Sequence, residues 1–250
     1  MGSKPVPTRL KREPLYEAVW ELRFHSKQPV FELLTGTIFS ESNRRNWGLR
    51  KISHLPASNV PPTLRRSDGN LRYLPVIRLD GSPISISIGE HVIAMSCVRP
   101  YIGWRMFGTR ILELASVVRE TGLVDRPERF SLKYLDIIEG AADLGMLSVA
   151  VSIAGRQLRS EPLQVRTELR VQDLLHIVEI AVPAHVVLQS GEQLQGTAVS
   201  TDTICLASEG AQDFWETFEA RLGQIHASNK ELFFQLLSEQ TLQYLEPEFG

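Results

Sequence analysis

The chain has 250 residues, with 27 Lys and Arg against 29 Asp and Glu, and 43% of the residues are hydrophobic. This ordinary globular composition excludes a wholly disordered, collagen-like or coiled-coil chain. No apolar run approaches the roughly 20 residues of a membrane-spanning helix. The two cysteines, Cys97 and Cys205, lie in apolar strand-like runs, which predicts buried thiols and a reducing cytoplasm.

The formal net charge of -2 conceals a difference between the ends of the chain. Residues 1–75 contain 13 Lys and Arg against 6 Asp and Glu, whereas residues 208–250 contain 2 basic and 8 acidic residues. Such polarity suits an acidic partner at one end or association between copies of the chain, and it also arises from ordinary solvated faces. All these interpretations stay open.

The first half predicts a regular succession of elements behind a basic arm. Residues 1–13 are polar and contain prolines, which indicates a flexible arm. Apolar and polar residues alternate through 14–24, as in a strand with one buried face, and an apolar stripe over 30–38 indicates a helix. After the irregular 42–72 segment we expect three strands and a helix, at 71–79, 84–88, 92–98 and 104–120.

The second half predicts a similar succession. A strand is expected at 129–138, and the small apolar residues of 141–155 have roughly the spacing of a helix. Strands are then expected near 164–171, 174–182 and 197–206, with Pro183 as an interruption, followed by a helix from about Gln212. Residues 228–231, Ser-Asn-Lys-Glu, match a capping box, so a last helix is predicted to begin there.

Two of the predicted helices share an internal regularity. One face of the first carries Trp104, Phe107, Ile111 and Leu114. The residues 111 positions later are Trp215, Phe218, Leu222 and Ile225. Amphipathic helices share such spacing by necessity, but a matched Trp and a matched order of elements need a further cause. We interpret the regularity as a tandem duplication.

The duplication predicts an α+β fold with two β-α-β(4)-α repeats. The first repeat would span 14–125, and the second 126–250 with an extra C-terminal helix. Joined edge to edge, they would form one curved antiparallel sheet with the helices on one side. This arrangement resembles the saddle of the TATA-binding-protein-like fold, which hosts several functions and fixes none of them.

Four segments resemble one uncharacterised, sporadically distributed family of bacterial and archaeal proteins. Residues 14–24, PLYEAVWELRF, are similar to its opening P-x-x-E-A-x-x-E-[IL]-R-F signature. RSDG at 66–69 is similar to its R-S-x-D-G turn, and PYIGWRMF at 100–107 to its P-Y-x-G-W-x-x-F. FSLKYLD at 130–136 is like its R-I-G-L-R-Y-I-N strand, with Lys133 for Arg and Asp136 for Asn. The resemblance implies an intracellular accessory protein and supplies no catalytic residues.

The sequence lacks the common motifs of catalysis and metal binding. It has no phosphate-binding glycine loop, no nucleophile elbow and no local pair of zinc ligands. His176 and His185 flank a strand-like run and could meet across a hairpin. Glu17 and Glu21 share a strand face with Arg23, which suits acid–base work or simple cross-strand pairing. We expect no catalytic residues, no metal and no cofactor.

Basic residues and aromatics of the 42–72 segment form a candidate binding surface. Arg and Lys bind phosphate oxygens and aromatic faces stack bases, although a dedicated nucleic-acid binder is usually basic overall. Two further arginines share a strand face with Gln164 and Glu168. The candidate binding residues are Arg44, Arg45, Trp47, Arg50, Arg65, Arg66, Arg72, Arg166 and Arg170.

Three functional hypotheses follow from the sequence. The favoured one is a non-enzymatic binding protein that contacts a protein partner, encoded nearby, or its own copy in a homodimer through exposed strand edges. By analogy alone, its accessory role would be toxin neutralisation or phage defence. The second is a nucleic-acid or nucleotide-binding protein that uses the basic 44–72 segment. The third is an enzyme acting on a small molecule in the concavity of the sheet.

Overall fold

The computed structural model describes residues 6–249 apart from 29, 141, 188–190, 192 and 208–210. The chain divides into two compact, discontinuous units. Unit 1 comprises Met1–Tyr16, Lys133–Thr203 and Gln224–Gly250, and unit 2 comprises Glu17–Leu132 and Ile204–Gly223. The predicted domain boundary after residue 125 does not coincide with a boundary between these units, the nearest of which lies between Leu132 and Lys133.

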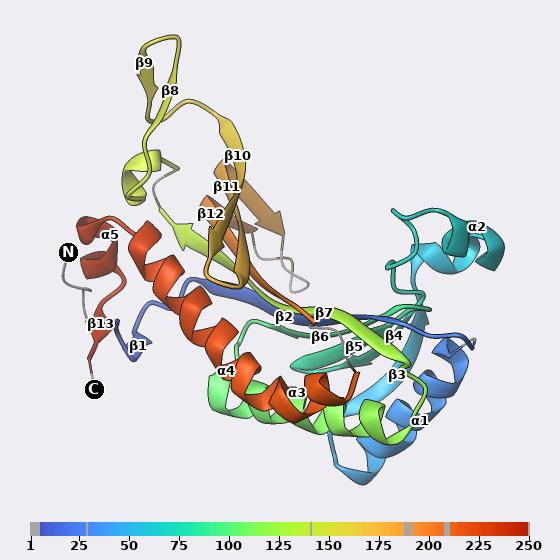
Figure 1. Cartoon of the computed structure of the whole chain (residues 1–250). Coiled ribbons are helices and arrows are strands. Elements are labelled where there is room, and N and C mark those ends of the chain that lie inside the picture. The colour runs from blue at the N-terminus through green and yellow to red at the C-terminus, as the bar shows by residue number, and fades with distance from the viewer. Residues whose placement is uncertain are drawn as a thin grey trace. The chain divides into compact units, whose positions relative to one another are not determined.

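Between residues 15 and 120 the elements include those of the predicted β-α-β(4)-α order, with a 3-10 turn and the short helix α2 inserted between β3 and β4 (Figure 1). The elements are β2 Leu15–His25, α1 Phe31–Arg44, β3 Leu49–His54, a 3-10 turn Pro56–Asn59, α2 Pro62–Ser67, β4 Ile77–Gly81, β5 Ile84–Ile88, β6 Val92–Val98 and α3 Trp104–Glu120. The strand expected at 71–79 therefore begins only at Ile77, since a turn occupies the residues before it.

The rest of the chain is richer in strands. Its elements are β7 Arg126–Glu139, a 3-10 turn Leu144–Met146, β8 Val151–Ile153, β9 Arg156–Leu158, β10 Leu163–Val171, β11 Leu174–Val187, β12 Gln193–Leu206, α4 Ala211–Leu236, α5 Glu239–Tyr244 and β13 Pro247–Glu248. None of the described helices is apolar over a stretch long enough to cross a membrane.

Nine strands form one open antiparallel sheet in the order β10-β11-β12-β7-β2-β6-β5-β4-β3. The α+β class with a single antiparallel sheet is thus confirmed. In the first half the order is β2-β6-β5-β4, and in the second it is β7-β12-β11-β10. In each half, the first strand therefore lies beside the last strand, and the other strands follow in the reverse of their order in the chain. A tandem duplication predicts this matched order.

Two predicted helix positions in the second half are wrong. The 141–155 segment forms a 3-10 turn and the strand β8 instead of a helix. The capping box at 228–231 starts no helix, because α4 continues through it to Leu236. The last helix, α5, begins later, where the Ser238 hydroxyl accepts a hydrogen bond from the Thr241 N–H at 3.2 Å.

The described part of the N-terminal arm is paired rather than flexible. Within unit 1, β1 (Arg9–Leu10) forms a two-stranded sheet with β13. The Thr8 N–H donates to the Glu248 carbonyl at 2.8 Å, and the Arg12 side chain forms an ion pair with Glu246 at 2.9 Å. Residues 1–5 of the predicted arm lie outside the described residues.

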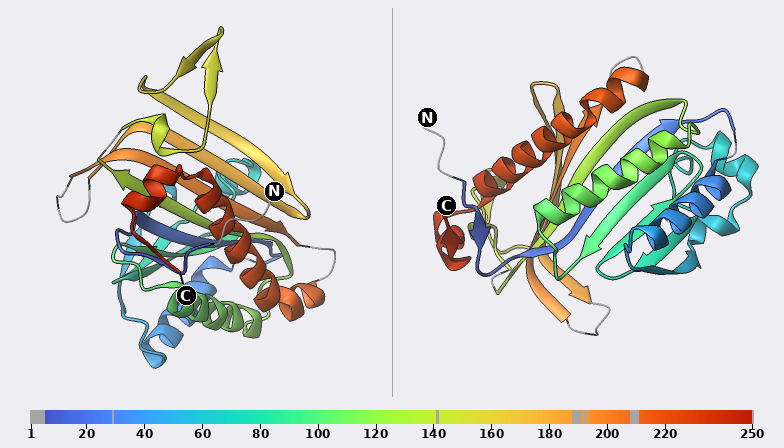
Figure 2. Two further views of the ribbon diagram at one scale, coloured as in Figure 1. Left: turned by 90° about the vertical axis from the view of Figure 1, so that its left-hand side faces the viewer. Right: turned by 90° about the horizontal axis from the view of Figure 1, so that it is seen from below.

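The core of unit 2 is aromatic. Trp20 of β2 contacts Phe218 of α4 edge-on with ring centroids 5.9 Å apart, and Phe130 of β7 lies 5.0 Å from Phe218. The helix α3 lies on the same strands, with Phe107, Ile111 and Leu114 buried (Figure 2). These contacts use the apolar helix faces that the duplicated spacing predicted, and they fix which side of β2 is buried.

Gly196 of β12 tests the packing of the strands in unit 1. A Cβ there would overlap the carbonyl oxygen of Ile138 in β7, so Gly196→Ala must separate two backbones. We expect a loss of roughly 3 kcal/mol in the free energy of unfolding, measured by urea denaturation. Gly36→Ala is the control, because a Cβ there meets nothing within 4 Å on the exposed side of α1. It should be neutral or stabilise by about 0.5–1 kcal/mol. Equal effects of the two variants would contradict this packing.

Candidate functional site

The face of β2 that is turned away from the helices is polar. Residues Ala18, Trp20, Leu22 and Phe24 are buried on the helix side, so the odd-numbered residues lie on the other face. On the neighbouring strands β6 and β5, the residues in register with this face have short side chains. They are Ser85, Ser87, Ala94 and Ser96. The hydroxyls of Ser85 and Ser96 hydrogen-bond at 2.9 Å. The long charged side chains of β2 therefore stand beside a row of small ones.

A group of charged side chains in unit 2 surrounds one aromatic ring. We call it the arginine cluster, and its members are Glu21, Arg23, Arg72, Tyr73, Glu128 and Arg129. The guanidinium groups of Arg23 and Arg72 lie 4.6 and 5.3 Å from the centre of the Tyr73 ring. The Tyr73 hydroxyl donates to Glu128 at 2.5 Å. Burial and this hydrogen bond raise the pKa of Tyr73, so the ring stays neutral between two cations.

Two guanidinium groups of the cluster have donors to spare. The contact of Arg72 with Glu128 and that of Arg129 with Glu21 are both 3.4 Å long, beyond the usual range of a charge-assisted hydrogen bond. The Nε atoms of Arg72 and Arg129 are buried and have no acceptor among the described residues. Buried donors are nearly always paired in folded proteins. The guanidinium groups of Arg72 and Arg129, whose side chains are partly exposed, therefore keep hydrogen-bonding capacity that the described residues do not use.

Two stacked histidines border the cluster. The rings of His25 and His91 are parallel within 1° with centroids 6.1 Å apart. Arg72 Nη2 lies 3.3 Å from His25 Nδ1. Because a guanidinium group has only donors, Arg72 donates this hydrogen bond and His25 Nδ1 accepts it. Burial, followed by the charge of Arg72, lowers the pKa of His91. His91 is therefore neutral at neutral pH.

Most basic residues of the predicted 44–72 surface are already paired with carboxylates. Glu41 binds both Arg44 and Arg45, at 2.6 and 3.0 Å, and hydrogen bonds from these two arginines lower the pKa of Glu41 to about 2. Glu90 binds Arg66 at 2.5 Å. The pairs offset much of the charge on which a phosphate contact would depend. Arg50 is exposed on β3.

Two of the predicted contact residues are structural instead. Trp47 is 5% exposed, and its indole N–H donates to Glu113 at 2.9 Å, so it offers no face for stacking. Arg65 is 4% exposed. It donates to the carbonyls of Ala57 and Val60 and to the buried Glu90. The next residue, Arg66, is also basic and is exposed, and for this reason the sequence alone did not distinguish Arg65 from it.

The remaining predicted residues, Arg166 and Arg170, lie in unit 1 on β10, where both are exposed. Arg166 forms ion pairs with Glu168 at 2.9 Å and with Glu179 of β11 at 3.6 Å. The predicted alternation of Gln164, Arg166, Glu168 and Arg170 on one face of the strand is present. These residues are described with unit 1, separately from the arginine cluster.

His176 and His185 do not meet across a hairpin, because both lie on the single strand β11. His176 is buried in unit 1. Its Nδ1 lies 2.9 Å from the Thr203 hydroxyl, and its Nε2 lies 3.2 Å from the Ser228 hydroxyl. Next to Ser228, the Asn229 side chain bonds to both the hydroxyl and the carbonyl of Thr201. The capping-box residues thus attach α4 to the sheet.

The sequence did not point to two ionisable groups in unit 1, the partly buried His226 and the buried Asp136. Burial, followed by the charge of Lys230, lowers the pKa of His226 to about 4, and His226 Nδ1 lies 2.9 Å from the Tyr134 hydroxyl. Burial, followed by the charge of Glu13, raises the pKa of Asp136 to about 8. Asp136 is at the position where the family resemblance has Asn, which was the only signal for it in the sequence.

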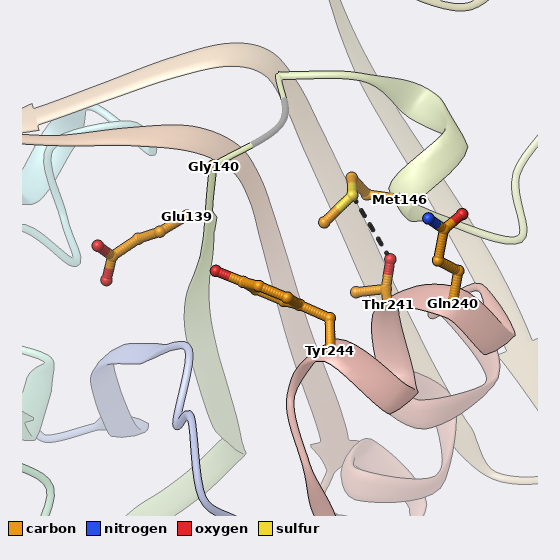
Figure 3. A pocket seen from close by; sticks show the side chains of 6 residues that line it. All are labelled: Glu139, Gly140, Met146, Gln240, Thr241 and Tyr244. Carbon is orange, nitrogen blue, oxygen red and sulfur yellow. Dashed lines mark hydrogen bonds between the residues drawn. The ribbon is translucent and has the colours of Figure 1, made fainter.

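Unit 1 also contains a small pocket of about 200 Å³ (Figure 3). Its walls come from β7, the 3-10 turn and α5, and the lining residues are Glu139, Gly140, Met146, Gln240, Thr241 and Tyr244. The Thr241 hydroxyl donates to Met146 Sδ at 3.6 Å. In Figure 3 the Glu139 carboxylate points away from Met146 and Thr241. The pocket therefore lacks a converging set of polar groups, and we assign the candidate site to the arginine cluster.

The role of Arg65 can be tested by stability. Arg65→Met removes the buried partner of Glu90 and leaves it only the exposed Arg66, so we expect a loss of about 3 kcal/mol in the free energy of unfolding, measured with urea. Arg50→Met, on an exposed position of β3, should change it by less than about 0.5 kcal/mol. Recovery of stability in Arg65→Met combined with Glu90→Gln would support the buried pair. Equal, small effects of both single variants would show that Arg65 is a surface residue.

Replacing Asp136 should increase stability in a pH-dependent way. Its pKa is higher in the folded protein than its ordinary value of 3.8, so the folded state binds the proton more tightly and stability falls as pH rises from about 4 to about 8. Asp136→Asn cannot ionise. The variant should be more stable than the parent at pH 8, by more than about 1 kcal/mol, and nearly equal to it at pH 4. A constant difference in urea denaturation at both pH values would contradict the raised pKa.

Among the described residues, no group of three or more His, Cys, Asp and Glu side chains could hold a metal ion. In comparisons with known proteins, no protein-family model matches the chain, and no curated protein matches it either. The geometry of the arginine cluster is accordingly the main ground on which function can be argued.

Proposed function

We propose that this chain is a non-enzymatic binding protein that recognises a carboxylate-bearing segment of an acidic protein partner through the arginine cluster. The observation that carries the proposal is the weak pairing of two partly exposed guanidinium groups, those of Arg72 and Arg129, whose contacts with Glu128 and Glu21 are both 3.4 Å long. The planar fork of an arginine binds carboxylates in pairs of hydrogen bonds. A side-chain carboxylate from a partner would supply closer acceptors to these groups.

The balance of charge supports an anionic ligand. The cluster and the adjacent Arg126, which lies 3.8 Å from Glu128, contain four arginines against the two carboxylates of Glu21 and Glu128. Arg23, Arg72 and Arg129 are partly exposed, at 23–30% of their side chains. They are accessible from solvent and yet sheltered enough for their charges to act strongly.

A protein ligand accounts for this surface better than a nucleic acid. Base stacking needs an open aromatic face, and Tyr73 has two arginine guanidinium groups against its ring while Trp47 is buried. Four arginines of the 44–72 segment, Arg44, Arg45, Arg65 and Arg66, are paired with Glu41 or Glu90. The nucleic-acid and enzyme hypotheses remain predictions with less support.

The test uses a hexaglutamate peptide as the probe, with titration calorimetry at low salt. We expect binding that weakens as salt rises, and about tenfold weaker binding by Arg129→Gln, since one charge-assisted hydrogen bond contributes roughly 1.5 kcal/mol. Arg105→Gln, on an exposed position of α3, is the matched control and should bind like the parent. An equal loss in both variants, or tighter binding of a single-stranded oligonucleotide than of the peptide, would refute the proposal.

A further inference from the structure

The strand β10 forms an open edge of the sheet in unit 1. It is the first strand in the sheet order, and among the described residues only β11 pairs with it (Figure 1). All nine residues of β10 pair with β11 without a shift in register. The strand contains no proline, and natural edge strands are usually protected by prolines, bulges or short length. Its outer N–H and C=O groups are therefore available to another strand.

The two faces of β10 differ in character. The odd-numbered residues face the same side as the buried residues His176, Val178, Ile180 and Val182 of β11, because directly paired residues share a face. This row is mostly apolar and poorly covered, since Leu169 is 40% and Val171 51% exposed. The even-numbered residues carry alternating polar and charged groups, which are Gln164, Arg166, Glu168 and Arg170.

The sequence of β10 is complementary to an inverted copy of itself. If two copies run antiparallel with Thr167 opposite Thr167, each Arg166 lies opposite a Glu168 of the other copy. On the other face Leu169 meets Val165, and Val171 meets Leu163. Directly opposed opposite charges and apolar pairs stabilise an antiparallel ladder. Every pair across the axis is thus compatible.

Neighbouring symmetric registers lack this complementarity. A two-fold axis at Arg166 places two Arg166 side chains opposite each other. An axis at Glu168 opposes two Glu168 side chains and places Arg166 against Arg170. Like charges directly opposite destabilise a strand pair, and a shift by a single residue would oppose the apolar row to the charged row. The charges of β10 therefore select one register.

We propose that two copies of this chain form a symmetric dimer by antiparallel pairing of their β10 strands, with Thr167 on the two-fold axis. The apolar row then continues across the axis, and the arginine–glutamate pairs specify the register. The interface consists mainly of one strand per copy, which is below the 1,200 Å² typical of stable complexes, so a dissociation constant of roughly micromolar size is expected. The dimer does not depend on the function proposed for the arginine cluster.

Charge reversal provides the first test, with sedimentation at concentrations up to roughly 100 µM. The parent should shift with concentration from the 28.1 kDa monomer towards twice that mass. Arg166→Glu and Glu168→Arg should each be monomeric, because each opposes like charges twice. An equimolar mixture of the two variants restores both opposite pairs and should form a mixed dimer. The existing ion pairs of Arg166 are about half-exposed and contribute little to folding, so both variants should stay folded.

The control reverses Arg50 on β3, the strand at the opposite end of the sheet order. Arg50→Glu should dimerise like the parent. A parent that remains monomeric throughout, single variants that dimerise as well as the parent, or a mixture that stays monomeric would each overturn the proposal.

A cysteine on the axis gives an independent test of the register. Opposed Cα atoms in an antiparallel pair are 4.5–5.5 Å apart, which suits a disulfide. With oxidised glutathione as the oxidant, Thr167→Cys should form a covalent dimer on a denaturing gel. Gln164→Cys should not, because its partner position is residue 170. Cys97 and Cys205 are buried and do not compete. Equal cross-linking of the two variants would refute the register.

Discussion

The alternation of buried and outward-facing residues in β2 is the constraint on which the rest of unit 2 depends. Trp20 must be buried against Phe218 for α4 to pack, and a strand that buries Trp20 necessarily turns Glu21 and Arg23 to the other face. A shift of one residue would place these charges in the aromatic core. The buried side of β2 thus creates the polar side, and the arginine cluster is a consequence of the core.

Ion pairs with nearby carboxylates determine which of the basic residues remain available to bind an anionic ligand. The sequence shows many arginines between residues 44 and 72. The pairs of Glu41 with Arg44 and Arg45 have local helical spacing, but nothing in the local pattern reveals the pairs that Glu90 forms. Glu90 is distant from Arg65 in sequence and reaches it only through the fold. Long-range pairing of this kind cannot be read from composition. In contrast, Arg72 contacts its carboxylate only at 3.4 Å, and its availability depends on that distance.

The fold was more predictable than the site, because its signals are periodic and local. The alternation in β2 and the apolar face of α3 correctly indicated a buried strand face and a packed helix. Prediction failed where tertiary contacts overrode local preference. Ser228 and Asn229 match a helix start, yet their side chains bond to His176 and Thr201 of the sheet, and the helix continues. The small residues of 141–155 have neither a strong helical nor a strong strand periodicity, and they form a 3-10 turn and the strand β8.

The matched strand order of the two halves explains why the outer edge of β10 is open. By that order β10 corresponds to β4, and β4 is covered on its outer side by β3, which pairs with it antiparallel. Among the described strands, the second half has no counterpart of β3, because residues 151–158 form the separate β8–β9 hairpin. The edge that a duplicated β3 would have covered is therefore open. A second copy of β10, running antiparallel, would occupy the position that β3 occupies in the first half.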